Sequence, residues 1–240
     1  MTISPNSFES QPETIEAVEK ATLRMVAQAL YDFSLEAEQI FKNEEDLVAD
    51  MGEDITREAL DRLGFSQIPI RLFGKIDFKK ARYVFHPDYA IRQALFVDSK
   101  AEKIEGEATV TLQTSQTSMS IRQRRGGRVL EVPGKLPTVI DREGQAYLTS
   151  TIFVKYHYNP RTRGANQLIN IVVAALPNGR LQEVYNPNER DTIWRAGRDA
   201  PSLGEEFRVR LHFGALKSKA NWRVQTIKIS PKMEFIWEGP

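Results

Sequence analysis

The stretch Ala94-Leu95-Phe96-Val97-Asp98-Ser99-Lys100 decides how this chain is interpreted, because a short apolar run ends there in charged residues. An apolar run of this length, closed by charge, is typical of a buried β-strand. Side chains alternate along a strand, so Asp98 and Lys100 are expected on one side and Ser99 on the other. The pattern predicts an aspartate and a lysine held together at the end of a core strand.

That pair suits metal-assisted hydrolysis. The carboxylate of Asp98 would hold a hard cation, and a second carboxylate from elsewhere in the chain would complete the protein ligands. The ammonium group of Lys100 would orient the attacking water or stabilise negative charge on a phosphate. For the three residues alone, a solvated strand edge is the plainer interpretation, because such short motifs recur by chance.

Two upstream aspartates are candidates for the second carboxylate. Asp88 follows a proline and lies ten residues before Asp98, but Pro-Asp is also a favoured turn pair. Asp77 lies twenty-one residues before Asp98, next to two lysines whose charge it could simply balance. Spacing alone does not choose between them.

Composition sets the outer limits. The 240 residues, 41% hydrophobic and 27% charged, predict one globular domain over residues 1–240. The absence of cysteine excludes disulfides and thiolate metal sites and agrees with a cytoplasmic protein. We expect no membrane association, because no apolar run is long enough to span a bilayer and no leader pattern is present. The net charge of +1 requires any DNA-binding surface to be local.

Helical periodicity comes first along the chain and strand patterns follow. We expect a long amphipathic helix over 12–41, with Ser10 as its N-cap, and a second helix over 55–63 that stops at Gly64. Strands are expected over 70–78, 82–85, 94–97, 150–158, 170–175, 207–213 and 222–229. This order predicts an α/β or α+β domain around a mixed sheet.

Blocks of sequence between about Ala17 and Ile227 add a resemblance to a known family. They include Glu53-Asp54-Ile55-Thr56, Ile76-Asp77-Phe78-Lys79, Leu95-Phe96-Val97-Asp98-Ser99-Lys100-Ala101, Tyr185-Asn186-Pro187 and Ala196-Gly197-Arg198. In this order they resemble the SfiI-type type II restriction endonucleases, of which BglI is a more distant relative. The resemblance implies the restriction-endonuclease-like fold, a central mixed β-sheet flanked by helices, with a long N-terminal helix.

The resemblance also implies which acid assists Asp98. The family's first catalytic aspartate corresponds to Asp77, so the implied catalytic set is Asp77, Asp98 and Lys100. The implied cofactor is Mg²⁺, held by Asp77, Asp98 and Ser99. Asp88 is set aside, because the family carries no required Pro-Asp here. Glu53 is either an outer acid or a carboxylate that favours the start of a helix.

Base reading is implied for a loop and a strand near the C-terminus. In the family, the segments matching Arg198 and Arg208-Val209-Arg210 contact G·C pairs, and bidentate arginine to guanine is the commonest specific contact. Asp199 could accept a hydrogen bond from cytosine. Without the family, Arg208 and Arg210 would be assigned to an exposed strand face paired with nearby glutamates. Residues 101–107 are more acidic than in SfiI, so an exact recognition sequence is not transferred.

Phosphate contacts are expected from the densest basic cluster, Arg122, Arg124, Arg125 and Arg128, which two glycines interrupt. Such contacts set register on DNA without carrying sequence information. A solvated hairpin tip is the equally weighted alternative. Lys79, Lys80 and Arg82 are further candidates for backbone contacts.

These patterns and the resemblance predict a magnesium-dependent type II restriction endonuclease that cuts double-stranded DNA at an interrupted, G·C-rich palindrome. Symmetric sites imply a symmetric protein, so a homodimer or a tetramer is expected, together with a partner DNA methyltransferase. One alternative is a structure-specific magnesium nuclease on the same fold. Another is a non-catalytic DNA-binding module, against which Asp77, Asp98 and Lys100 argue.

Overall fold

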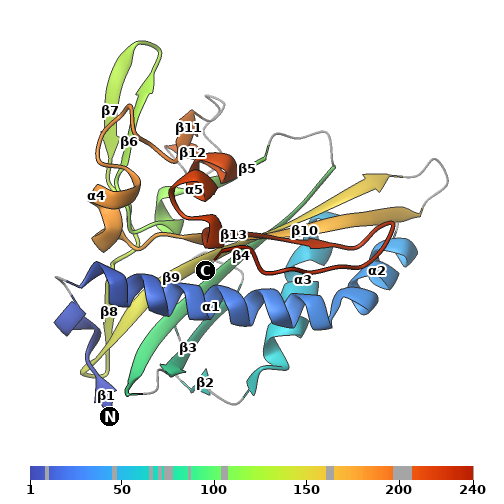
Figure 1. Cartoon of the computed structure of the whole chain (residues 1–240), viewed down its shortest axis with the longest axis horizontal. Helices are drawn as coiled ribbons and strands as arrows, with labels where there is room; N and C mark the ends of the chain where they lie inside the picture. Colours follow the sequence, from blue (N-terminus) through green and yellow to red (C-terminus); the bar gives the residue numbers. More distant parts are fainter. Residues whose placement is uncertain are drawn as a thin grey trace.

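The central feature of the computed structural model is a large mixed sheet with the strand order β13-β10-β9-β4-β3-β2, to which β1 and β8 add at the margins (Figure 1). The structure describes residues 1–8, 11–44, 48–64, 67–69, 72, 78–85, 88–103, 108–160, 165–196 and 207–239. The strands of this sheet are β1 (Thr2–Ile3), β2 (Gln67–Ile68), β3 (Phe78–Phe85), β4 (Ala90–Lys103), β8 (Val139–Arg142), β9 (Gln145–Pro160), β10 (Asn166–Leu176) and β13 (Val224–Lys228).

Strand β4 makes the sheet mixed, because it pairs parallel with β9 and antiparallel with β3. Its parallel register runs from Gln93 opposite Leu148 to Lys103 opposite Tyr158. The apolar residues of β4 before Asp98 are buried, which confirms the expected core strand. The expected mixed sheet flanked by helices is confirmed as well.

Three helices lie along one side of the sheet: α1 (Pro12–Asp32), α2 (Ser34–Asn43) and α3 (Val48–Asp61) (Figure 1). Their apolar stripes form one core with alternate residues of the sheet. Members of that core include Leu23, Leu30, Phe41, Ile55, Leu95, Val97, Ile152 and Val154. Burial of these stripes, more than intrinsic propensity, holds the helices in place.

The prediction of one helix over 12–41 is wrong at Phe33, which separates α1 from α2 with φ −93° and ψ 6°. The Ser34 hydroxyl donates to the Leu30 carbonyl at 2.9 Å, a bond that competes with regular helix hydrogen bonding. The apolar periodicity continues across the break, so the pattern did not reveal it. The expected N-cap, Ser10, lies outside the described residues.

The second helix begins at Val48, earlier than the predicted start at residue 55. Gly52 interrupts the helical pattern in the sequence, and the structure shows that there is little room for a side chain at this position. A Cβ atom at this position would lie 3.2 Å from the ring of Tyr156 on β9. Because α3 starts early, Glu53 lies in its second turn, and its predicted role at a helix start is wrong.

The remaining elements form a smaller structure beside the main sheet. A second sheet has the order β11 (Trp194–Ala196), β12 (Arg208–His212) and β5 (Thr109–Gln113), and β6 (Ile121–Arg125) pairs with β7 (Arg128–Val132) in a hairpin that extends away from the molecule (Figure 1). Short helices α4 (Gln182–Tyr185) and α5 (Phe213–Lys219) pack near them. Short 3₁₀ turns cover Pro5–Phe8, Thr114–Gln116, Gly179–Leu181 and Asn221–Arg223.

Two predicted strands are shorter than expected. The strand predicted over 207–213 ends at His212, because Phe213 begins α5, and the strand predicted over 222–229 begins at Val224, because Asn221–Arg223 forms a 3₁₀ turn. Residues 82–85 belong to the longer β3. Most of the strand expected over 70–78 lies outside the described residues.

A buried ion pair joins α1 to the C-terminal part of the sheet. The guanidinium of Arg223 lies 2.7 Å from Glu19 of α1, and both side chains are buried. Arg223 also stacks over the ring of Tyr185, at 4.2 Å from its centroid. Burial raises the pKa of the Glu19 carboxyl, although the charge of Arg223 and a hydrogen bond from the backbone of Asn178 lower it.

We predict that Arg223→Leu lowers the free energy of unfolding by about 3–5 kcal/mol at neutral pH, because it leaves the Glu19 carboxylate buried without its cation. Without Arg223, burial raises the pKa of Glu19 further above its ordinary 4.5. A carboxyl with a raised folded-state pKa costs stability as pH rises. The deficit measured by urea unfolding should therefore shrink as the pH falls from neutral towards 4.5 and be smallest below that value, and a constant deficit would contradict this account. Exposed Glu13→Gln is the control.

Candidate active site

Asp98 and Lys100 lie on β4 and face away from the three helices. The Lys100 ammonium is 3.3 Å from an Asp98 carboxylate oxygen. Between them in the sequence, the hydroxyl of Ser99 donates to Thr56 of α3 at 2.8 Å, on the helix side of the sheet. The predicted alternation of the three side chains is confirmed.

The pair opens into a cavity of about 230 Å³ between β4 and the smaller sheet. Asp98 is only 2% exposed and forms its floor, whereas the Lys100 side chain is 41% exposed. Residues of β4, β5, β12 and the turn after β5 line it: Asp98, Lys100, Thr111, Leu112, Gln113, Gln116 and Arg208. A buried carboxylate beside an accessible ammonium is suited to hold a cation and an anionic group side by side.

Gln116 is part of this site, although no sequence pattern indicates it. Its side-chain amide donates to an Asp98 carboxylate oxygen at 2.7 Å. Its carbonyl oxygen accepts from the backbone N–H of Gln113 at 2.8 Å. A glutamine in a polar turn carries no recognisable motif, and only the packing of β5 beside β4 brings it to Asp98.

Lys155 is a second residue that sequence patterns did not single out. It stands opposite Lys100 in the parallel register of β4 and β9, and it is buried. Its ammonium donates to the Thr109 carbonyl at 2.7 Å and lies 2.7 Å from Glu102. Glu102 belongs to the acidic stretch 101–107, so part of the acidity of that stretch neutralises a buried lysine.

The donors at the cavity fit a hard cation such as Mg²⁺, which prefers carboxylate oxygens and bound water. Among the described residues, Asp98 is the carboxylate that lines the cavity. Nowhere in the described residues do three or more His, Cys, Asp or Glu side chains come together as a possible metal site. Asp77 lies outside the described residues; the next residue, Phe78, pairs with Val97, which precedes Asp98. Because the hydroxyl of Ser99 faces α3, its main-chain carbonyl would be its donor to a metal.

Asp88 is far from this cavity. It precedes β4, which begins at Ala90 and runs continuously to Asp98. At about 3.3 Å per residue, the strand from Ala90 to Asp98 spans about 26 Å, a distance that the two residues from Asp88 to Ala90 are too short to cover. Geometry therefore excludes Asp88 as the partner of Asp98 within this chain.

Arg208 and Arg210 share one side of β12, as predicted, because they alternate with buried Val209 and Leu211. Arg208 stands opposite Gln113 of β5 and lines the cavity. Arg210 stands opposite Arg195 of β11, which adds another cation to that part of the smaller sheet. Arg198 and Asp199, and the glutamates proposed as alternative partners, lie outside the described residues.

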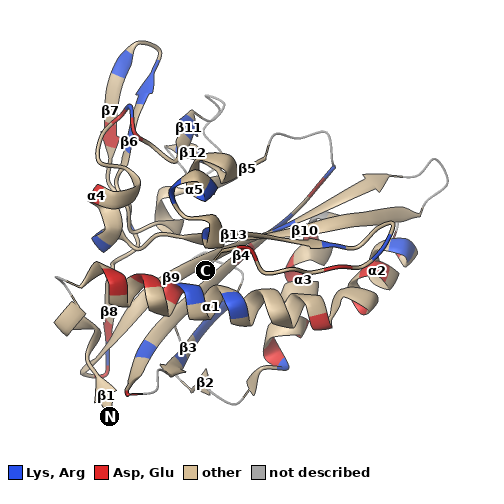
Figure 2. Ribbon diagram, in the orientation of Figure 1, with Lys and Arg blue, Asp and Glu red and all other residues tan. Residues whose placement is uncertain are grey.

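The predicted basic cluster forms the β6–β7 hairpin, whose far end carries basic residues (Figure 2). Gly126 and Gly127 form its turn with φ of +54° and +77°, which suits glycine. The Arg124 guanidinium is 3.5 Å from Glu189 and its side chain is half exposed. The Arg125 guanidinium lies 5.7 Å from the centroid of the Phe207 ring.

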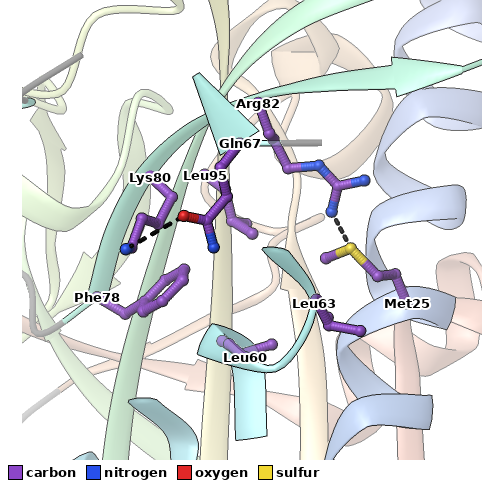
Figure 3. Close-up of a pocket in the computed structure, with 8 residues that line it drawn as sticks. All are labelled: Met25, Leu60, Leu63, Gln67, Phe78, Lys80, Arg82 and Leu95. Carbon is purple, nitrogen blue, oxygen red and sulfur yellow. Dashed lines mark hydrogen bonds between the residues drawn. The ribbon is translucent and has the colours of Figure 1, made fainter. Parts of the chain in front are cut away.

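The side chains of Lys80 and Arg82 occupy a different place, a pocket on the helix side of β3 and β4 (Figure 3). Arg82 contacts the sulfur of Met25, and burial lowers its pKa to about 10. Lys80 lies 3.2 Å from Asp61 of α3. Neither of these two side chains lines the Asp98 cavity.

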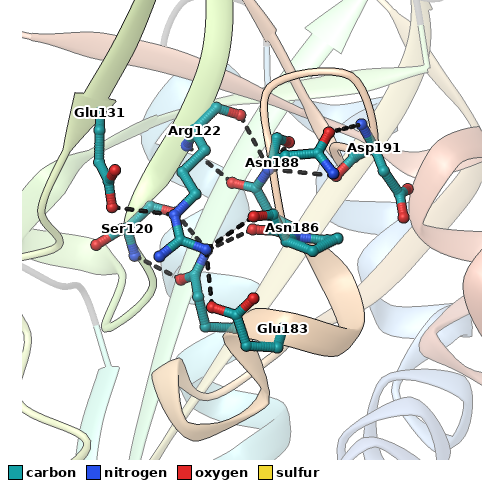
Figure 4. Close-up of polar contacts among 9 residues, drawn as sticks. Ser120, Arg122, Glu131, Glu183, Asn186, Asn188 and Asp191 are labelled. Carbon is teal, nitrogen blue, oxygen red and sulfur yellow. Dashed lines mark hydrogen bonds and ion pairs between the residues drawn. The ribbon is translucent and has the colours of Figure 1, made fainter.

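Arg122 differs from the other hairpin arginines because carboxylates surround it (Figure 4). Its guanidinium contacts Glu131 at 3.0 Å and Glu183 at 2.8 Å, and these hydrogen bonds raise its pKa. Its backbone N–H donates to the Asn186 side chain at 2.8 Å, and the Asn186 amide returns a bond to its carbonyl. Arg122 therefore fixes the base of the hairpin to the segment after α4.

Comparison with known proteins adds sequence relatives. A family model described as the type II restriction enzyme SfiI matches residues 15–227. The type II restriction enzyme SfiI of Streptomyces fimbriatus is 33% identical over 237 residues, which cover 93% of this chain and 87% of that protein. No helix within the described residues is long and apolar enough to cross a membrane.

Solved structures agree with the sequence relatives. A crystal structure of tetrameric restriction endonuclease SfiI bound to cognate DNA matches with a TM-score of 0.87 and 31% identity, covering 96% of this chain and 91% of that one. The restriction endonuclease BglI bound to its DNA recognition sequence matches with a TM-score of 0.75 and 19% identity, covering 94% of each chain. At this low identity, the similarity to BglI shows a shared fold and nothing more.

Proposed function

This chain belongs to the SfiI family of type II restriction enzymes, and from that premise we propose that residues 1–240 act as one domain that cuts an interrupted, G·C-rich palindrome with Mg²⁺. The enzyme is a site-specific deoxyribonuclease. One observation carries the finer proposal: Asp98, Lys100 and Arg208 line the same cavity. Groups for phosphodiester chemistry and for base reading would therefore face the same stretch of DNA.

We assign the catalytic set to Asp77, Asp98 and Lys100, with Asp77, Asp98 and the main-chain carbonyl of Ser99 as ligands of Mg²⁺. Support comes from the antiparallel register, in which Phe78, the residue after Asp77 in the sequence, pairs with Val97, the residue before Asp98. When bound, Mg²⁺ lowers the pKa of a coordinated water and neutralises charge on the phosphate.

Each residue then has a separate task. Asp98 supplies a buried carboxylate whose direction is held by Gln116 and Lys100. Lys100 places its ammonium beside that carboxylate, where it donates a hydrogen bond to the attacking water or to a phosphate oxygen. Because β5 and β12 enclose one side of the cavity, the buried Asp98 carboxylate is shielded from bulk water, whereas the Lys100 ammonium remains accessible to a phosphate.

Base reading is assigned to Arg198, Arg208 and Arg210 as donors to guanine, and to Asp199 as an acceptor from cytosine. Arg124 and Arg125 are assigned to phosphates. For Arg122 we propose a supporting task, because Glu131 and Glu183 already balance its charge. It would set the direction in which the hairpin presents the other arginines.

The proposed assembly follows from the symmetry of a palindrome, which a two-fold symmetric homodimer matches. The related SfiI structure is a tetramer bound to cognate DNA, and we propose the same pairing of two dimers here. Such a nuclease requires a DNA methyltransferase that protects the same sequence in the host genome.

The catalytic assignment predicts that Asp98→Ala, Asp77→Ala and Lys100→Ala each lower magnesium-dependent cleavage by about 100-fold or more, the scale for loss of one transition-state-stabilising group. Binding of the same duplex in calcium, measured by gel shift, should persist. Asp88→Ala is the matched control and should cleave like the wild type. Activity in Asp77→Ala together with inactivity in Asp88→Ala would overturn the assignment.

The proposed specificity predicts that the wild-type enzyme cuts a mixed-sequence plasmid with magnesium into discrete bands. Sequencing of the run-off ends should show one interrupted palindrome, because fixed arginine contacts select the same base pairs each time. Nicking that follows DNA structure instead of sequence would support a structure-specific nuclease, and no cleavage at all would refute the proposal.

The division of arginines predicts two different phenotypes. Arg208→Ala should relax selectivity at one position of the site and cost about 1–3 kcal/mol of discrimination there. Arg124→Ala should weaken binding to all sequences alike and lower the slope of log affinity against log salt by about 1. Arg57→Ala on α3 is the control, with both quantities unchanged. Equal effects of Arg208→Ala on every sequence would remove Arg208 from base reading.

A further inference from the structure

Gln116 joins the carboxylate of Asp98 to the smaller sheet. It is buried at the end of the 3₁₀ turn Thr114–Gln116, directly after β5. Its amide nitrogen donates to Asp98 at 2.7 Å while its amide oxygen accepts from the backbone of Gln113 at 2.8 Å. Both polar atoms of the Gln116 amide group are therefore hydrogen-bonded, the nitrogen to the main sheet and the oxygen to the smaller sheet.

These two bonds fix the direction of the amide group. The oxygen must face the N–H of Gln113, so the nitrogen faces Asp98. The turn is closed reciprocally, because the Gln113 side chain also accepts from the backbone N–H of Gln116. Gln116 is consequently held in a constant position relative to the last residue of β5.

The same residue of β5 stands opposite Arg208 of β12 in the antiparallel register. A continuous set of contacts thus runs from Arg208 through Gln113 and Gln116 to Asp98. At the other end of β5, Lys155 of β9 donates to the Thr109 carbonyl at 2.7 Å. Both ends of β5 are therefore attached to the face of the main sheet that carries Asp98, through Gln116 at one end and Lys155 at the other. Strand β12 pairs in turn with β5.

We propose that Gln116 is a positioning residue that couples base reading by Arg208 to the orientation of the Asp98 carboxylate. The inference rests on the proposed function of Asp98 and Arg208. A matched base pair at Arg208 holds β5 in place, and Gln116 then holds Asp98 in the direction that the cation requires. A mismatched base pair displaces β5, and a displacement of about 1 Å is enough to cost about 100-fold in rate.

The test uses the full-length enzyme and single-turnover cleavage of two duplexes, the cognate site and one with the base pair read by Arg208 exchanged. For Gln116→Ala we expect the cognate rate to fall about 10- to 100-fold. The rate on the exchanged duplex should fall less, so the ratio of the two rates narrows. The magnesium concentration for half-maximal rate should rise, while cognate binding in calcium stays unchanged.

Gln116→Glu separates the two bonds of the side chain. It keeps an acceptor for the Gln113 N–H but replaces the donor to Asp98 with a negative charge, so it should lose cognate activity like the alanine variant. Gln225→Ala is the control, because it removes buried amide bonds to Trp222 and Glu238 far from the site. It should lower the melting temperature without changing the rate ratio or the magnesium requirement.

The proposal would be overturned if folded Gln116→Ala kept the rate ratio and the magnesium requirement of the wild type. Full activity in Gln116→Glu would also overturn it, and so would the same narrowed rate ratio in Gln225→Ala. If the alanine variant does not fold, the glutamate variant decides by the same measurements. Loss of cleavage in Asp98→Ala beside an unaffected Gln116→Ala would leave the proposed function standing and remove this inference alone. Magnesium-dependent cleavage by Asp98→Ala would remove both.

Discussion

The structure depends on one constraint at β4, which must bury an ionisable carboxylate in the middle of a sheet that is packed on both sides. Removing Asp98 from water is costly unless nearby groups compensate its charge. Lys100 two residues later and Gln116 from the turn after β5 provide that compensation. The Asp98 side chain forms the floor of the cavity and, through Gln116, contacts the turn that follows β5 of the smaller sheet.

The opposite face of β4 sets the register that places Asp98. Ser99 donates to Thr56 of α3, and Thr56 shares a hydrogen bond of 2.8 Å with the Tyr156 hydroxyl of β9. The close approach that Gly52 permits brings α3 near enough for these bonds. A slip of one residue in β4 would turn Asp98 into the apolar core and Ser99 into the cavity. The hydrogen bonds on the helix side of the sheet therefore keep Asp98 facing the cavity on the other side.

Sequence patterns predicted those parts of the site that depend on neighbours in the chain. The alternation of Asp98 and Lys100 follows from strand geometry, and the hairpin around Gly126 follows from glycine conformation. Gln116 and Lys155 were missed because their partners come from other strands, and a polar side chain shows its partner only after folding. Spacing alone left Asp77 and Asp88 open, and only the family resemblance favoured Asp77; the structure adds that the extended strand from Ala90 to Asp98 keeps Asp88 away from the cavity. The break between α1 and α2 at Phe33 was also missed, because the helical spacing of apolar residues continues across a single non-helical residue.

The charges of this chain also explain how a protein of net charge +1 is suited to bind DNA. Several cations are neutralised within the fold, among them Arg122, Lys155 and Arg223, which contact glutamates. Counting basic residues therefore overstates the charge that DNA would meet, and the remaining cations matter through their positions. Arg208 owes its position to the same pairing with β5 that places Gln116 against Asp98. Arg208, proposed to read a base pair, and Gln116, which contacts the proposed catalytic Asp98, are both neighbours of Gln113, so under this proposal specificity and rate share a physical origin.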